Sequence, residues 1–562
     1  MNDKTKRKRS RKTTKLEPWR INQEASIQEK ILKLIEAEEY DEAERLLHQE
    51  YERRYPENFG YGNLVSLARL NVKLDRSSRA ELFLFQAIDK DDKNPEAPEF
   101  LVQIYLSAKQ FHAATEIIDL LLSIDPTSSQ YRYWQILSLC GVPQRSPEII
   151  PAWNSFVADF PDAATDTQLH NAVVYGLCGA GRYLEAEEHV KRFKLEEIYD
   201  AGTGQFLPVL YHGLGQIDKA IERLNAMAEK DPENVAWVWN RGLMKLSAGD
   251  LIGGWSDYRA RWDWKNFPSP KRTLNLPHWG GECLQDASIL VWAEQGLGDQ
   301  FMFGVAINAL LKKAPKHVRI EVLPKAIPIF ERWYPECEIA EWANVADQDE
   351  LLQKQFNYQI PMGDLVARFF TSQDAILNLP RRYLRLPVSD RPQSVTEFGQ
   401  QFPVILGIAW RSHAIDSVRH TSYANVKFIK YIIDHLPKDI GFVVLQYAIT
   451  EEEKQLLTEC DNVLIPEEDL FNDILALGQY CSSCDLVVTP GIMVWQLAGV
   501  YKVPVITWGG KAGWTKLGMD VSPWFPNIDH IDADAYYDRR RLADVIVSKV
   551  SVATKGLVTE KS

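Results

Sequence analysis

The residues best suited to chemistry stand together in the segment AEQGLGDQ, directly after a short apolar run that ends at residue 292. Gly296 and Gly298 permit positive φ and close approach of a ligand to the backbone, and the N-terminus of the helix that we expect next favours negative charge. Asp299 adds a carboxylate that can accept a proton. The alternative is that Asp299 is an ordinary N-terminal helix residue, favoured by the helix dipole. Gln295 completes this candidate anion-binding and acid–base site.

A second set of polar residues follows apolar runs later in the chain. Arg411 and Ser412 come directly after one run, and Arg419 lies further along the same loop. Cationic side chains there would bind the phosphate groups of an anionic ligand and stabilise its negative charge. Gln446 lies at the end of the next apolar run, where it would face the same ligand. Exposed arginines are common in loops, so a purely structural role stays open for this set.

A third candidate loop, TPGIMVWQLAG, begins at Thr489 and leads into another predicted helix. Backbone amides at a helix N-terminus bind phosphate without needing a particular side chain, which makes Gly491, Ile492 and Met493 candidates. Thr489 offers a hydroxyl and Gln496 an amide to the same ligand.

Short apolar runs rich in β-branched residues must position these three loops. They are SILVWA, VRIEVLP, VILGIAW, GFVVLQY, DLVVTP and VPVITW, all between residues 288 and 508. Such runs are typical of parallel strands that are buried on both faces, and helical segments separate most of them. We therefore predict a doubly wound α/β fold in two lobes, 276–395 and 396–550, with a flexible tail at 551–562. Ligands of such folds bind at the carboxyl ends of the strands, here in a cleft between the lobes.

The first half of the chain contains an internal repeat. A small residue recurs at intervals of 37, 34, 38, 34, 34 and 34 residues, at Ala43, Ala80, Ala114, Ala152, Ala186, Ala220 and Gly254. Four residues after each stands an apolar or aromatic residue, at Leu47, Leu84, Ile118, Phe156, Val190, Leu224 and Tyr258.

This pattern predicts pairs of amphipathic helices, because the small residue lets two helices approach and the apolar residue fills their interface. Such pairs stack into a solenoid with an extended groove. The period is that of tetratricopeptide repeats, and we place about six or seven units at residues 25–275. The groove is expected to dock a protein or peptide. The alternative is a solenoid that only supports the neighbouring domain.

Composition and charge narrow the classes of function. The chain has 562 residues, 45% hydrophobic and 25% charged, which is ordinary for a globular protein of several domains. The net charge is −13, but residues 1–20 carry +7, which leaves −20 for the rest. An acidic body argues against nucleic acid as a partner. Residues 1–24 are expected to form a basic disordered tail.

The same inspection places the protein in the cytoplasm. No apolar run approaches the roughly 18 residues needed to span a bilayer, so no transmembrane segment is expected. The first residues also lack the apolar core of a signal peptide. The seven cysteines are too scattered for a disulfide framework, which favours a reducing compartment.

The motifs together resemble a known family. AEQGLGDQ, preceded by YRARWDW and LPHWGGECL and followed by FNYQIPMGDL, RRYLRLP, GIAWRS and SPWFPN, is similar to bacterial proteins that fuse tetratricopeptide repeats to a glycosyltransferase family nine, or heptosyltransferase-like, domain. The plan is also similar to that of protein O-linked N-acetylglucosamine transferases. The resemblance implies a two-lobed glycosyltransferase fold of type B, a nucleotide-sugar donor in the cleft and no metal or other cofactor. It also implies that Asp299 is the general base.

The chain departs from that family in its third loop, where relatives carry Asp-Thr and, within the helix, His. Here those places read Gly491, Ile492 and Gln496. Our leading hypothesis is a glycosyltransferase that moves a sugar from a nucleotide-sugar donor to a protein docked on the repeats. The departure favours either an unusual donor sugar or a non-catalytic scaffold with a degenerate transferase domain. A third alternative is a lipopolysaccharide or capsule glycosyltransferase with a carbohydrate acceptor.

Overall fold

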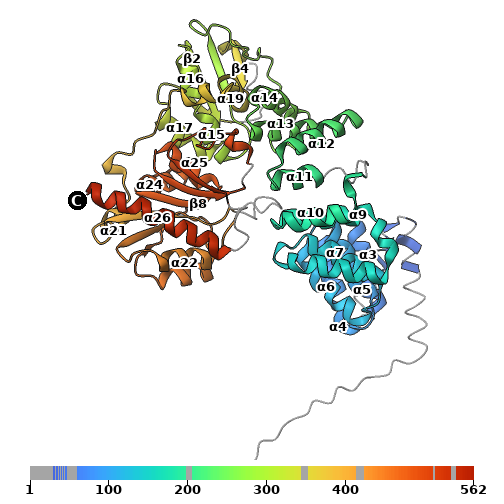
Figure 1. Ribbon diagram of the computed structural model, residues 1–562. Coiled ribbons are helices and arrows are strands. Elements are labelled where there is room, and N and C mark those ends of the chain that lie inside the picture. The colour runs from blue at the N-terminus through green and yellow to red at the C-terminus, as the bar shows by residue number, and fades with distance from the viewer. Residues whose placement is uncertain are drawn as a thin grey trace, which may run out of the picture. The chain divides into compact units, whose positions relative to one another are not determined.

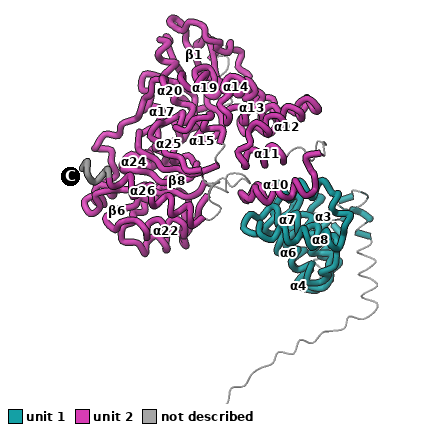
Figure 2. The backbone as a smooth tube through the Cα atoms, viewed as in Figure 1, with its two compact units in different colours: residues 1–176 teal, residues 177–562 magenta. Residues whose placement is uncertain are grey.

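The computed structural model describes residues 60–197, 206–342, 352–412, 423–510, 513–532 and 539–561, with scattered positions between 30 and 46. Its contacts divide the chain into two compact units, residues 1–176 and 177–562 (Figures 1 and 2). The basic tail expected at 1–24 and the candidate Arg419 lie outside the described residues.

Helices that pack each on the next build the first unit. They are α3 (Tyr61–Lys73), α4 (Ser77–Lys90), α5 (Glu96–Ser107), α6 (Phe111–Ile124), α7 (Ser129–Cys140), α8 (Ile149–Asp159) and α9 (Thr167–Gly179), which crosses the limit between the units. The short 3₁₀ helices η2 (Pro143–Glu148) and η3 (Pro161–Thr165) flank α8.

The predicted small residues are the buried ones in most of these helices. Ala80 and Ala114 are fully buried, as are the apolar residues one turn later. In α8 Ala152 is partly exposed, whereas Ile149, Trp153 and Phe156 are buried. The predicted apolar residue Phe156 is therefore buried as expected, and the predicted small residue Ala152 is not.

The second unit begins with more helices of the same kind. They are α10 (Tyr183–Arg192), η4 (Leu195–Glu197), α11 (Phe206–Gly213), α12 (Ile217–Lys230), α13 (Val235–Ala248), α14 (Leu251–Tyr258) and η5 (Arg259–Trp262). At Gly254 an added Cβ would stand 2.7 Å from the Leu246 side chain, so glycine lets α14 lie close on α13. Trp239, Trp255 and Tyr258 of this last pair share one hydrophobic core with the sheet that follows. The contacts therefore run across residue 275, where the sequence placed the end of the solenoid.

A four-stranded parallel sheet follows, in the order β3-β2-β1-β4. Its strands are β1 (Ser288–Trp292), β2 (His317–Val322), β3 (Glu338–Glu341) and β4 (Tyr358–Pro361). Its helices are α15 (Leu297–Gly304), α16 (Ile307–Leu311), η6 (Pro324–Ala326), α17 (Ile327–Trp333), α19 (Met362–Phe369) and α20 (Gln373–Leu377). Every residue of β1 is buried, as its continuous apolar run predicts.

The second sheet has six parallel strands in the order β10-β9-β8-β5-β6-β7. They are β5 (Val404–Ile408), β6 (Ile440–Val444), β7 (Val463–Leu464), β8 (Leu486–Pro490), β9 (Val505–Gly509) and β10 (Ile528–Asp532). Its helices are η7 (Val388–Asp390), α21 (Gln393–Phe398), α22 (Val426–His435), α23 (Glu451–Thr458), α24 (Ile474–Ser482), α25 (Met493–Val500), η9 (Trp514–Lys516) and α26 (Arg539–Lys561). The strand order reverses between β5 and β8, which is where open α/β sheets bind ligands.

The helical repeats and the two parallel sheets confirm the expected fold class, an α solenoid followed by a two-lobed α/β fold of type B. The sequence predicted a flexible tail at 551–562. The structure corrects this prediction, because helix α26 continues to Lys561. The helix extends because Ile546, Val550 and Thr554 carry its buried stripe past residue 550. No helix among the described residues is long and apolar enough to cross a bilayer.

Candidate functional site

The first and third predicted loops meet, although they belong to different lobes. The loop of residues 293–296, which we call the β1–α15 loop, opens α15, and Gly491 and Ile492 open α25. Helices α15 and α25 pack against each other. A Cβ added at Gly298 would stand 3.1 Å from Gln496 Oε1, so the absence of a side chain leaves room for this amide.

A cavity of about 230 Å³ lies beside this meeting point, at the carboxyl ends of β8, β9 and β10. We call it the β9 cavity. Two of the predicted residues, Gly491 and Gln496, line it. The sequence did not single out Thr507, Lys516 and His530, which also line it. A polar residue near the end of a predicted strand was the available signal for Thr507.

Three buried polar atoms of this cavity lack a hydrogen-bond partner within the part of the chain that the structure describes. One is Nε2 of His530, which lies 3.5 Å from Asp532 Oδ1. The other two are an amide oxygen and a hydroxyl oxygen. They are Oε1 of Gln496, whose residue is 9% exposed, and Oγ1 of Thr507, whose residue is 4% exposed. Buried polar groups are normally paired, and each unpaired one costs about 1–3 kcal/mol. A ligand in the cavity that hydrogen-bonds to both atoms would recover that cost.

The charge of the β9 cavity is low. Burial and the nearby Lys516 ammonium lower the pKa of His530 to about 4, so its imidazole is neutral at pH 7. Lys516 forms an ion pair with Asp532 at the end of β10. The cavity therefore offers mainly neutral hydrogen-bonding groups.

Asp299 stands at the third position of α15 and is half-buried. Its Oδ2 accepts a hydrogen bond of 3.3 Å from the backbone N–H of Gly296. This contact matches the structural alternative given above. A carboxylate can accept several hydrogen bonds, so the general-base role of Asp299 stays a prediction that this geometry permits.

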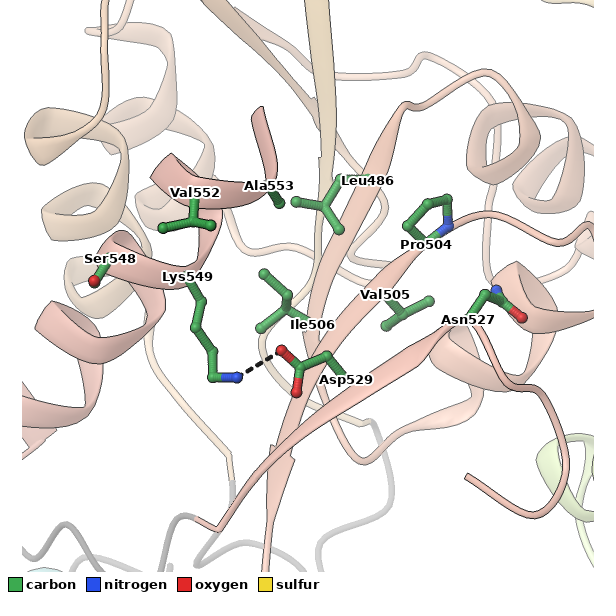
Figure 3. A pocket seen from close by; sticks show the side chains of 10 residues that line it. All are labelled: Leu486, Pro504, Val505, Ile506, Asn527, Asp529, Ser548, Lys549, Val552 and Ala553. Atoms are coloured by element: carbon green, nitrogen blue, oxygen red, sulfur yellow. Dashed lines mark hydrogen bonds and ion pairs between the residues drawn. The ribbon is translucent and has the colours of Figure 1, made fainter. Parts of the chain in front are cut away.

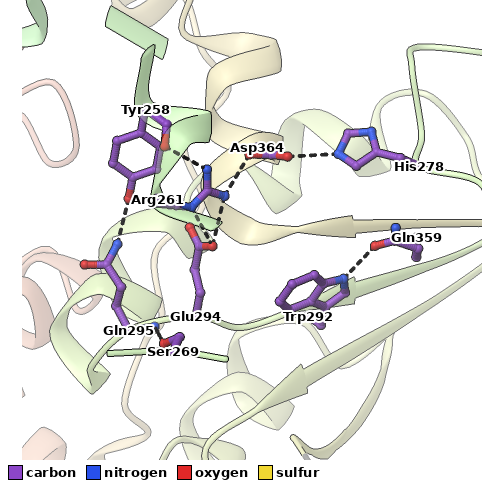
Figure 4. A network of polar contacts seen from close by, with 9 residues as sticks. All are labelled: Tyr258, Arg261, Ser269, His278, Trp292, Glu294, Gln295, Gln359 and Asp364. Atoms are coloured by element: carbon purple, nitrogen blue, oxygen red, sulfur yellow. Dashed lines mark hydrogen bonds and ion pairs between the residues drawn. The ribbon is translucent and has the colours of Figure 1, made fainter. Parts of the chain in front are cut away.

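A buried network of charged groups lies behind the β1–α15 loop (Figure 4). Glu294 Oε2 accepts hydrogen bonds from Arg261 Nε at 3.0 Å and from Arg261 Nη2 at 2.9 Å. The same Nη2 donates to Asp364 Oδ1 at 2.7 Å, and Asp364 Oδ2 lies 2.9 Å from His278 Nε2. One guanidinium thus serves two carboxylates.

The pKa values of the two carboxylates in this network are shifted in opposite directions. Burial raises the pKa of Glu294 to about 7. Burial would also raise the pKa of Asp364, but hydrogen bonds from His278 and Arg261 together with the guanidinium charge lower it to about 2. The sequence analysis assigned no role to Arg261, Glu294 or Asp364, although each lies in a segment that carries the family resemblance.

The second predicted set lies at the carboxyl ends of β5 and β6. Arg411 Nη2 donates to Glu453 Oε2 at 2.6 Å and to the Ala448 carbonyl at 3.0 Å. Although burial disfavours the charged form of Glu453, the hydrogen bonds from Arg411 and its neighbours hold the pKa of that carboxyl below its usual value. The cation predicted to bind a diphosphate is thus already paired.

Gln446 and Ser412 also make structural contacts. Gln446 is buried, and its Oε1 accepts hydrogen bonds of 2.9 Å from the backbone N–H groups of Trp410 and Arg411. Its Nε2 donates to the Tyr447 carbonyl at 2.8 Å, and the Tyr447 hydroxyl donates to Ser412 Oγ at 3.3 Å. These contacts fix the ends of two neighbouring strands.

The remaining predicted residues of the third loop point mainly to the backbone. Thr489 is fully buried in β8, and its hydroxyl donates to the Pro490 carbonyl at 3.3 Å. The amides of Gly491 and Ile492 donate to carbonyls at 3.1 and 2.7 Å. The third predicted residue, Met493, is the first residue of α25, so its amide belongs to the first turn of the helix.

A larger cavity lies at the opposite end of the strands of the second sheet (Figure 3). It measures about 360 Å³ and is lined by Leu486, Val505 and Val552, with an ion pair of 2.6 Å between Lys549 and Asp529. Leu486 and Val505 are the first residues of their strands, so this cavity lies at the amino ends. None of the predicted site residues lines it. In the described ranges, no group of three His, Cys, Asp or Glu side chains could hold a metal ion.

No family model matches the sequence. Over 336 residues the chain is 25% identical to Protein FlbA of Caulobacter vibrioides, in a match that covers 56% of this chain and 55% of that protein. The chain thus spans about half the length of this curated relative.

Two solved structures are similar to parts of this chain. A tetratricopeptide repeat protein from Parabacteroides merdae is 16% identical, with a TM-score of 0.33, and the match covers 42% of this chain and 91% of that one. A glycosyl transferase of family 9 from Veillonella parvula is 11% identical, with a TM-score of 0.35, and the match covers 49% of this chain and 98% of that one.

Proposed function

We propose that this chain is a glycosyltransferase that moves a sugar from a nucleotide-sugar donor to an acceptor protein docked on its repeats. The observation that carries the proposal is the meeting of Gly298 and Gln496 beside the β9 cavity. Two helix N-termini from different lobes converge there with the buried oxygens of Gln496 and Thr507 that lack a hydrogen-bond partner among the described residues.

The chemistry of the site suits such a donor. Helix N-termini attract the diphosphate through their free amides and their dipoles. Gln496 and Thr507 would hydrogen-bond to hydroxyls or to the base of the nucleotide sugar. The cleft needs no overall positive charge for this, because the amides act at short range.

Asp299 is the group that we assign to proton transfer. Its carboxylate would accept the proton of an acceptor hydroxyl while the hydroxyl oxygen forms a bond to the anomeric carbon of the donor. The bond from that carbon to the diphosphate oxygen breaks, and the nucleoside diphosphate leaves with the electron pair. Amides at the start of α25 would stabilise the leaving group.

The solenoid supports a protein acceptor, since stacked helix pairs present an extended binding surface. A carbohydrate acceptor, such as lipopolysaccharide or capsule, remains the rival. Comparing the glycan content of surface proteins with that of lipopolysaccharide in a deletion strain separates the two, and loss from lipopolysaccharide alone contradicts the protein acceptor.

A non-catalytic platform is the second candidate function. It is favoured by the pairing of Arg411 with Glu453 and by the absence of a carboxylate at Gly491. The platform requires that Asp299→Asn leave the cellular phenotype intact. The transferase requires that the same change abolish glycan transfer while donor binding persists.

Donor binding is tested by calorimetry of the full chain with nucleoside diphosphates and their sugars. Thr507→Val removes the unpaired hydroxyl at nearly constant shape and is expected to weaken binding by about fivefold or more. Thr554→Val is the matched control, because its buried hydroxyl donates to the Val550 carbonyl on α26. Wild-type chain that binds none of these nucleotides would refute the proposal.

A further inference from the structure

Gln295, the residue before the first glycine of the β1–α15 loop, has an unusual backbone with φ of 63°. This left-handed region is unfavourable for residues other than glycine, so it persists only where surrounding contacts hold it. Two such contacts come from the end of the last helix pair and from the segment that follows it. Gln295 Nε2 donates to the Tyr258 hydroxyl at 2.6 Å, and the backbone N–H of Gln295 donates to Ser269 Oγ at 2.6 Å.

The residue before it is held from the same side. Glu294 ends the run from β1 and accepts both hydrogen bonds from Arg261, which belongs to η5 directly after the last helix pair. The Arg261 guanidinium carbon lies 4.5 Å from the Tyr258 ring centroid and 4.4 Å from that of Trp262. Arg261 is completely buried, so this connection cannot be an incidental surface contact.

Helix α19 of the same lobe also encloses the Glu294 side chain. An added Cβ at Gly363 would stand 1.9 Å from Glu294 Oε1, so α19 leaves room for this carboxylate and no more. Tyr258 itself packs in the common core, with ring centroids 4.9 Å from Trp239 and 6.0 Å from Trp514. The loop is therefore fixed by an element that the sequence assigned to the docking solenoid (Figure 4).

We propose that the last helical repeat is part of the transfer site, with Tyr258 and Arg261 as positioning residues. They hold Gln295 in its left-handed conformation and thereby set where Gly296 and Asp299 point. This inference rests on the proposed function for the role of Asp299. Beyond the proposed function, the inference states that removing the Tyr258 hydroxyl slows glycan transfer without weakening donor binding.

Tyr258→Phe tests this, because it removes the hydroxyl that Gln295 contacts and keeps the packed ring. The expected result is a fall of about tenfold in kcat for glycan transfer, since small misplacements of catalytic groups are costly, with the donor Kd within about twofold. Tyr334→Phe is the matched control. Tyr334 is equally buried, and its hydroxyl donates to the Gly304 carbonyl at the far end of α15 at 2.9 Å.

Gln295→Met removes the same hydrogen bond from the other side and serves as the second variant. Because Tyr258→Phe and Gln295→Met remove the same hydrogen bond, transfer by the double variant should be no slower than transfer by the slower single variant. Multiplied effects would show that the two side chains act independently, which overturns the proposal.

Hydrogen exchange on the ligand-free chain provides a readout that does not depend on activity. Tyr258→Phe is expected to speed amide exchange in residues 295–299 by about fivefold, whereas Tyr334→Phe leaves these amides unchanged. Equal effects of the two variants, or no effect of Tyr258→Phe on exchange, overturn the inference. If the wild type binds no nucleotide, the proposed function fails, and exchange still decides whether Tyr258 holds the loop.

Discussion

Removing the guanidinium of Arg261 should destabilise residues 177–562, and the loss should be larger at pH 8 than at pH 5. Arg261→Met keeps the length and the apolar stem but leaves Glu294 and Asp364 without their shared cation. Removing one partner of a buried ion pair costs about 3–5 kcal/mol. For a unit of this size, that loss lowers the melting midpoint by about 4–6 °C.

The pH dependence follows from the two pKa values. The folded-state pKa of Glu294, about 7, lies above its ordinary value of 4.5, so its favourable contribution is complete below pH 4.5 and is lost as pH rises through 7. That difference is worth about 3 kcal/mol. The pKa of Asp364 is lowered from 3.8 to about 2, so its contribution is present above pH 3.8 and lost only below it. At pH 5 Glu294 is therefore neutral, and the only carboxylate of this pair that loses the charge of Arg261 is Asp364, which keeps its contact with His278.

Scanning calorimetry of the wild type, Arg261→Met, Glu294→Gln and the double variant at pH 5 and pH 8 measures this. Glu294→Gln keeps an acceptor for Arg261 and removes one buried charge, so it should flatten the decline in stability between the two pH values. The double variant should recover part of the loss at pH 8. Equal losses at both pH values, with no recovery in the double variant, would refute the idea that two carboxylates share one cation.

Three more results are expected. Gly298→Ala places a Cβ 3.1 Å from the Gln496 amide and should weaken nucleotide binding by about fivefold, measured by calorimetry; unchanged affinity would show that the amide moves freely. Arg411→Met leaves a partly buried carboxylate and should cost about 1–3 kcal/mol of stability, with nucleotide affinity within about twofold; a loss of affinity would instead support the diphosphate role. A chain that begins at residue 276 lacks the last helix pair and should aggregate, whereas one that begins at residue 206 should stay folded and monomeric in gel filtration.

The fold could be predicted because its signals are local. Apolar runs such as VILGIAW mark buried strands, and the recurrence from Ala80 to Gly254 marks helix pairs without any knowledge of what they contact. The partial exposure of Ala152 in α8 and the end of α26 were missed for the opposite reason. Which residues of α8 are buried depends on the elements that pack against it, and α26 continues past residue 550 because Val550 and Thr554 are buried against the rest of the unit.

The candidate site could be predicted only where glycines directly follow a predicted strand. The glycines of AEQGLGDQ and TPGIMVWQLAG follow strands, so their loops were found. Thr507 and His530 become part of a cavity only when β9 and β10 lie beside β8. Arg261 and Glu294 are 33 residues apart in different predicted domains, and no sequence pattern shows that these charges are buried against each other.

The connection between the repeats and the loop bears on how an acceptor would reach Asp299. Helix α14 ends at Tyr258, whose hydroxyl binds Gln295, and Asp299 follows four residues after Gln295. A polypeptide docked on α13 and α14 would thus lie against a surface whose position is fixed relative to the proposed base. Because these helices and the first sheet share one hydrophobic core, that register does not depend on a flexible linker. Placing an acceptor hydroxyl near a carboxylate requires such rigidity, since rate depends steeply on the distance between reacting atoms.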